Sequence, residues 1–291
     1  MVMVAMVAMV AMADARVPAV PAVPAVPGGP GGSGTPAPGR VSQLVTDFGL
    51  RLFRAALAPR GDTNAAFAPY GATSVLLALQ VATAGTARRQ LEEAMGVSID
   101  AGGPRLGGSR LSAPSRQRRI LPGVLGGPVP PRATRGRPFL RPHGGQEPVA
   151  MMATEGRLRC GDFRTPGGVP FTVAEVPYAG GEVALLLVAP AERHQPLVTL
   201  LPLLSARGVT EWVTQLRAVP RVLVVPRFTL DTSWDLRGPL RALGVLDPFD
   251  PASADFTPVS GEEHLVLRQV LQKVRMEVTE NGTEVASASG G

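Results

Sequence analysis

Residues 271–289, LQKVRMEVTENGTEVASAS, contain the pattern from which the rest of the chain can be interpreted. Val274, Met276 and Val278 alternate with polar residues, a period of two that is typical of a strand buried on one face. The alternation stops at residues 280–284, and no side chain in the tail that follows is larger than valine. Such a tail can remain a solvated loop, or it can enter a sheet without colliding with the layer beneath. We therefore predict a strand followed by a segment that can either remain a solvated loop or enter a sheet.

The same residues also allow a simpler interpretation. Asn281 and Gly282 form a favourable turn dipeptide, so this segment can be an ordinary hairpin. Asn281-Gly282-Thr283 is in addition a glycosylation sequon, which makes Asn281 a candidate acceptor of an N-linked glycan.

Composition limits the class of protein. A chain of 291 residues with 45% hydrophobic content can form one large domain or two small ones. The single cysteine, Cys160, excludes an internal disulfide framework and a cysteine-rich metal site. The net charge of +6 is local, because residues 101–146 hold nine Arg and no acidic residue, leaving 20 Lys+Arg against 23 Asp+Glu elsewhere. The charge is therefore a property of one tract and not of the whole surface.

The N-terminal segments are expected to lie outside the folded domain. Residues 1–13 are apolar and uncharged but too short to span a bilayer as a helix, and small residues follow near Ala15. We predict a signal peptide over residues 1–15, and hence a secreted, extracellular protein. Residues 16–39 contain a Pro triplet repeat and a Gly/Pro tract, which favour an extended, disordered linker.

Phrases spread over residues 40–291 resemble those of the serpin family. FAPYGATSVLLALQVATAGTARRQLEEAMG at 67–96 resembles the helical signature that follows Phe-Ser-Pro, with Ala68 where the family usually has serine. PVAMM at 148–152, EVPY at 175–178 and the strand RVLVVPRFTL at 221–230 resemble further family phrases. ENGTEVASA at 280–288 resembles the hinge, Glu-x-Gly-Thr-Glu-Ala-x-Ala, that precedes an exposed reactive loop.

The resemblance implies an α+β fold of mixed sheets surrounded by helices. Residues 101–142 form an Arg-rich insert without a long apolar period, and we expect this insert to be irregular. The family has central strands of the main sheet in this region, and the chain ends at Gly291 within the hinge tail. The fold is therefore expected to be a partial serpin domain over residues 40–291, incomplete in the centre and at the C-terminus and without the bait residue.

The resemblance also implies a function, the inhibition of serine proteases of the plasminogen activator type. The family traps a protease when a cleaved loop inserts into the main sheet, and insertion requires small side chains in the hinge. A glycan on Asn281 would be expected to obstruct this insertion. The residues that the resemblance assigns to the inhibitory hinge are Glu280, Gly282, Thr283, Glu284, Val285, Ala286, Ser287 and Ala288.

The competing interpretation is a non-inhibitory, serpin-derived protein that binds heparin-like polyanions. Clustered Arg side chains suit sulfate and phosphate groups, and such binding should weaken steeply with salt. The candidate residues are Arg116, Arg118, Arg119, Arg135 and Arg137.

Catalysis is not expected. His143, His194 and His264 stand in unrelated contexts without the spacing of a metal site, and no nucleophile elbow or phosphate-binding motif is present. We therefore predict neither a cofactor nor a metal, and no nucleic-acid or membrane partner.

Overall fold

The computed structural model describes residues 6–8, 38–60, 63–99, 115–122, 134–140, 145–179, 183–192, 195, 197–260 and 265–290. The helices are α1 (Pro38–Leu57), α2 (Pro69–Ala82), α3 (Gly85–Met95), α4 (Ala206–Gln215) and α5 (Arg237–Ala242), with the 3-10 turns η1 (Ala58–Arg60), η3 (Leu197–Leu203) and η4 (Asp247–Phe249). The strands are β1 (Met6–Ala8), β2 (Ser115–Pro122), β3 (Arg135–Leu140), β4 (Gln146–Arg164), β5 (Pro170–Pro177), β6 (Ala184–Pro190), β7 (Arg217–Pro226), β8 (Phe228–Asp235), β9 (Leu271–Thr279) and β10 (Gly282–Gly290).

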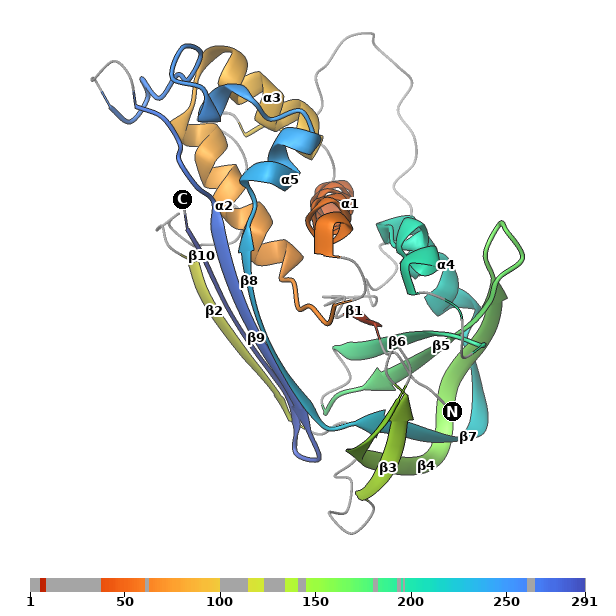
Figure 1. Cartoon of the computed structure of the whole chain (residues 1–291). Coiled ribbons are helices and arrows are strands. Elements are labelled where there is room, and N and C mark those ends of the chain that lie inside the picture. Colours follow the sequence, from red (N-terminus) through yellow and green to blue (C-terminus); the bar gives the residue numbers. More distant parts are fainter. Residues whose placement is uncertain are drawn as a thin grey trace, which may run out of the picture.

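These strands form two antiparallel sheets. The six-stranded sheet has the order β1-β6-β5-β4-β3, with β7 also pairing with β4. The four-stranded sheet has the order β2-β10-β9-β8, and its long strands run along one side of the molecule in Figure 1. The segment 221–230, predicted as one strand, divides between the two sheets, because β7 ends at Pro226 and β8 begins at Phe228.

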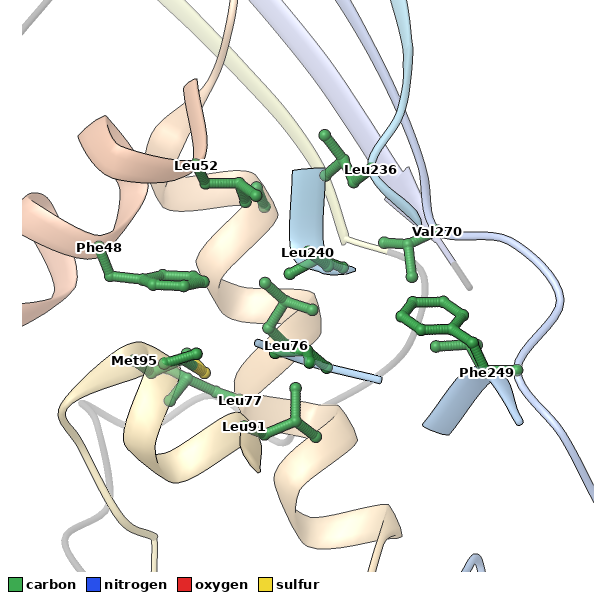
Figure 2. Close-up of a cluster of buried hydrophobic side chains, with 14 of the residues drawn as sticks. Phe48, Leu52, Leu76, Leu77, Leu91, Met95, Leu236, Leu240, Phe249 and Val270 are labelled. Atoms are coloured by element: carbon green, nitrogen blue, oxygen red, sulfur yellow. The ribbon is translucent and has the colours of Figure 1, made fainter. Parts of the chain in front are cut away.

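Three hydrophobic clusters hold the layers together. The first lies between the sheets and joins residues such as Val176 and Leu185 to Val274, Met276 and Val278. The alternation predicted for β9 is thus confirmed, with its apolar side facing the other sheet. The second cluster joins α1, α2, α3 and α5 to Trp234 of β8 and to Val270, which precedes β9. Figure 2 shows part of this cluster, including Phe48, Leu76 and Phe249. The third covers the other face of the six-stranded sheet with η3, α4 and part of α1.

The helical signature at 67–96 is present as α2 and α3. α1 begins at Pro38, so the predicted linker of residues 16–39 ends two residues too late, and the rest of that linker lies outside the described residues. α3 ends at Met95, and Gly96 caps it in the left-handed conformation that glycine favours. Of the predicted signal peptide only β1 is described, where Met6–Ala8 pairs with Leu186–Val188 of β6.

The expectation of an irregular tract at 101–142 is wrong for two parts of it. Residues 115–122 form β2 and residues 135–140 form β3. Neither segment has an apolar alternation. Their extended conformation is instead supported by the backbone ladders with β10 and β4. The tract therefore supplies a neighbour for the hinge, which its composition does not predict.

Candidate functional site

Most of the hinge segment, which we define as residues 280–288, lies inside the four-stranded sheet, beginning at Gly282. Its strand β10 pairs with β2 along Gly282–Ser289 and with β9 along Gly282–Gly290. Of the two options predicted for this segment, the structure shows the inserted one. Because both edges of β10 are paired, its backbone N–H and C=O groups gain partners on two sides.

The hairpin interpretation also describes the local geometry. β9 and β10 are joined by a two-residue turn, and the turn residues are Glu280 and Asn281 instead of the predicted Asn281 and Gly282. Gly282 has a φ of 137°, a conformation that residues with a side chain rarely adopt. The backbone conformation at position 282, the first residue of β10, therefore favours glycine over any other residue.

Successive residues of β10 face opposite sides of the sheet. Thr283, Ser287 and Ser289 are buried on the inner face, which we define as the face that carries Val274 and Met276 of β9. Glu284, Ala286 and Ala288 are half-buried on the outer face. Val285 packs against the cluster between the sheets. The hinge therefore presents hydroxyl groups to the interior and mostly methyl groups to the exterior.

The start of α2 leaves little space above the inner face of β10. A Cβ atom added to Gly71 would lie 3.2 Å from the Oγ of Ser287 and 3.4 Å from the Oγ of Ser289. Contacts of this length leave no room for a large side chain at either position unless α2 moves. The small size of the hinge residues is thus matched by the helix they face.

A glutamine links this part of the strand to α2. Nε2 of Gln272 donates hydrogen bonds to the carbonyl of Ala68 at 3.0 Å and to Oγ of Ser289 at 3.2 Å, while its Oε1 accepts from the N–H of Ala68 at 3.3 Å. Ala68 is the position where the resembling family usually has serine. Here the polar connection runs through the backbone of Ala68, so it does not need a hydroxyl at this position.

Tyr178 connects the first residues of the hinge to the other sheet. It follows β5, and its hydroxyl donates a hydrogen bond of 2.6 Å to Oγ1 of Thr283. Both side chains are buried, and burial raises the pKa of the Tyr178 phenol despite the contact with Thr283. Sequence reasoning placed Tyr178 only in a family phrase and did not identify this role.

Glu280, at the turn, is held by two residues that the sequence did not single out. Thr134 donates a hydrogen bond of 2.7 Å to Oε1 of Glu280, and Nη1 of Arg227 lies 3.9 Å from Oε2. The hydrogen bond from Thr134 is the main reason why the pKa of the Glu280 carboxyl lies below its ordinary value, and Arg227 adds a smaller electrostatic contribution. Asn281, next along the turn, is exposed.

The predicted polyanion residues are divided between two sheets. On β2, Arg116 and Arg118 pair with Ala288 and Ala286 of β10, whereas Arg119 pairs with Val285. Arg135 and Arg137 are exposed on β3 of the six-stranded sheet. The structure therefore does not bring the five residues together on one strand or one sheet.

Other site classes find no support among the residues that the structure describes. No group of three or more His, Cys, Asp or Glu side chains there could hold a metal ion. His143, His194 and His264 all lie outside the described residues. None of the described helices has the length and apolar content that a membrane-spanning helix needs.

Comparisons with known proteins agree with this geometry. The family described as "Serpin (serine protease inhibitor)" matches residues 122–291. Plasminogen activator inhibitor 1 from Neovison vison is 30% identical, and the match covers 86% of this chain and 83% of that protein. Among solved structures, the myxomaviral serine protease inhibitor 1 (SERP-1) has a TM-score of 0.70 and 26% identity, covering 84% of this chain and 99% of the other. Native protease nexin-1 with heparin has a TM-score of 0.75 over 84% of this chain and 88% of the other, and at 20% identity it supports the fold alone.

Proposed function

This chain belongs to the serpin family of serine protease inhibitors, and from that premise we propose that it inhibits proteases of the plasminogen activator type. The family consists of protease inhibitors and not of enzymes, as the matched relatives indicate. The likeness to plasminogen activator inhibitor 1 at 30% identity supports this target class.

The observation that carries the proposal is the position of the hinge as a central strand. β10 has a neighbour on each side and small or hydroxyl-bearing residues facing α2. Each ladder hydrogen bond formed on insertion contributes about 0.5–1.5 kcal/mol, so a strand paired on both edges gains stability from many such bonds. Insertion of this segment is thus a source of free energy that can drive a trap.

In the proposed mechanism, the target protease cleaves an exposed loop continuous with β10 and forms an acyl-enzyme with it. The loop then enters the sheet beside β2 and β9, carries the protease with it and distorts the protease active site before the ester is hydrolysed. In this mechanism Thr283 is among the first residues to enter, and it meets Tyr178. The pairing of β10 with β2 and β9 supports this mechanism, because it is the arrangement expected after insertion.

The test is the formation of a covalent complex between a plasminogen activator and a form of the protein that carries a reactive loop after β10. We expect a complex that survives denaturing gel electrophoresis, since an ester bond joins the two chains. A Thr283→Arg variant should be cleaved without forming the complex, because Thr283 is buried and a charge there cannot be solvated in the sheet. Glu284→Arg is the matched control, since residue 284 is half-buried on the outer face opposite Glu277.

Two outcomes would contradict the proposal. Inhibition that is lost on denaturing gels would indicate simple reversible binding. A Thr283→Arg variant that forms as much complex as the parent chain would show that entry of the hinge into the sheet is not required.

Secretion is part of the proposal, and its basis is the apolar segment within residues 1–15. The cleavage position near residue 15 and the extended conformation of the linker stay predictions. N-terminal sequencing of protein collected from culture medium should find a start near residue 16, and an intact Met1 in that protein would contradict cleavage.

Polyanion binding stays a prediction as well. Of its five candidate residues, Arg135 and Arg137 are exposed on β3, and the other three lie on β2. Retention on a heparin column that falls steeply with salt, and that weakens in an Arg135→Ala/Arg137→Ala variant, would support it.

A further inference from the structure

The glycosylation sequon of the chain coincides with the tip of the β9–β10 hairpin. The sequence has two asparagines, and only Asn281 is followed by Thr at the second position, since Asn64 is followed by two alanines. Any enzymatically removable N-linked glycan on this chain must therefore be on Asn281. The mechanism proposed above assigns no role to this side chain.

Asn281 lies outside the ladders of the four-stranded sheet. It is one of the two turn residues, its side chain is exposed, and its N–H donates a hydrogen bond of 3.3 Å to Oγ1 of Thr279. The preceding residue, Glu280, is directed toward Thr134 and Arg227, so the two turn residues have different surroundings. In Figure 1 the turn lies at the end of the sheet that is remote from α2, α3 and α5.

The third residue of the sequon is in a different environment. Thr283 is buried, and its hydroxyl accepts the hydrogen bond of 2.6 Å from Tyr178. Transfer of a glycan requires access to the whole sequon, including the hydroxyl of its Thr. With β10 in the sheet this hydroxyl is inaccessible, although the asparagine itself is exposed. Transfer therefore has to precede the docking of β10 against Tyr178.

From these contacts we infer that Asn281 carries an N-linked glycan that is added before β10 docks and that then projects from the hairpin tip. Because residue 281 is a turn residue and not a ladder residue, the glycan needs no space between β2, β9 and β10. The expectation from sequence that a glycan at Asn281 would obstruct insertion does not fit this geometry. The modification and the inserted hinge are compatible.

This inference rests on the proposed secretion, so the experiment separates the two. The full chain is expressed in mammalian cells in two forms, one with its own N-terminus and one preceded by an established secretory signal. Cells and medium are both analysed for a mass shift removed by peptide N-glycosidase F. We expect the shift in both forms, its loss in Asn281→Gln, and its retention in the matched controls Asn64→Gln and Thr283→Ser.

The outcomes distinguish a failure of the proposed glycan site from a failure of the proposed secretion. A shift in the signal-bearing form alone supports the glycan site and contradicts secretion by the native N-terminus. Absence of the shift from the signal-bearing form, in both cells and medium, overturns the glycan site.

A second measurement tests the compatibility of the glycan with the inserted strand. Thermal unfolding midpoints are compared for the glycosylated protein, the same protein after enzymatic removal of the glycan, and Asn281→Gln. Equal midpoints are expected, because the glycan extends into solvent. Midpoints that rise in both glycan-free forms would show that the glycan opposes the docking of β10, and would overturn this placement.

Discussion

Both sheets of the molecule bury apolar side chains, but they differ in whether they also bury polar ones. The six-stranded sheet buries large aliphatic residues such as Val176, Leu185 and Leu187. Among the described strand residues, every buried polar side chain belongs instead to the four-stranded sheet. These residues are Thr232, Gln272, Thr283, Ser287 and Ser289.

This difference indicates which sheet can exchange a strand. Removal of a strand with large apolar side chains leaves cavities and exposes hydrocarbon, and both effects cost free energy. Removal of β10 leaves only small spaces on the inner face, and its hydroxyl groups can bond to water instead. The six-stranded sheet is thus a fixed support, and the four-stranded sheet can gain or lose its central strand at lower cost.

The largest expected effect follows from placing an aliphatic side chain of the six-stranded type into β10. Ser287→Leu should destabilise the protein by about 2 kcal/mol, because overpacking against Gly71 and α2 forces the layers apart. Ala286→Leu, one residue away on the outer face, should change stability by no more than about 0.5 kcal/mol. Urea denaturation of the two variants measures the difference. Equal losses would show that the two faces of β10 do not differ in available space.

A smaller effect is expected from cutting the link between the sheets. Tyr178→Phe should cost about 1.5 kcal/mol, since it leaves the buried hydroxyl of Thr283 without its donor. Adding Thr283→Val should recover part of the loss, because both polar partners are then replaced by apolar groups. A double-mutant cycle by thermal or urea unfolding provides the coupling energy, and strictly additive losses would mean that the bond contributes nothing.

The smallest effect concerns Glu280 at the turn. The pKa of its carboxyl is lower in the folded protein, chiefly through Thr134, so ionised Glu280 stabilises the fold at pH values above the ordinary glutamate pKa. That contribution is lost as the pH falls through the lowered pKa. Glu280→Gln should therefore cost about 1 kcal/mol at neutral pH. The gap between variant and parent should close as the pH falls below the lowered pKa of Glu280, and a gap that is independent of pH would contradict the role of the charge.

The contacts of the hinge show how far sequence reasoning extends. The strand β9 and the hinge residues were predicted from a local alternation and from a family phrase, and both signals lie within twenty residues of one another. The partners of the hinge could not be predicted in this way. Tyr178 is 105 positions from Thr283, and Thr134 is 146 positions from Glu280, so no local spacing reveals them.

The tract that contains β2 shows that a strand can also form where the local sequence does not predict one. Residues 115–122 have no apolar period, and composition alone indicates an irregular segment. They form a strand because the backbone of β10 offers hydrogen-bonding partners along its whole edge. Ladder bonds of this kind depend on backbone groups and are nearly independent of which side chains are present.

By itself, the sequence determined that residues 285–290 have side chains small enough to lie either in solvent or within a sheet, and that Gly282 can adopt the conformation the turn requires. Only the tertiary structure decided between these states. A strand is stabilised by the edges that flank it and by the layer beneath it, and here those are β2, β9 and the start of α2, all formed by other parts of the chain. Side-chain size permits insertion, whereas the neighbouring backbone provides its free energy.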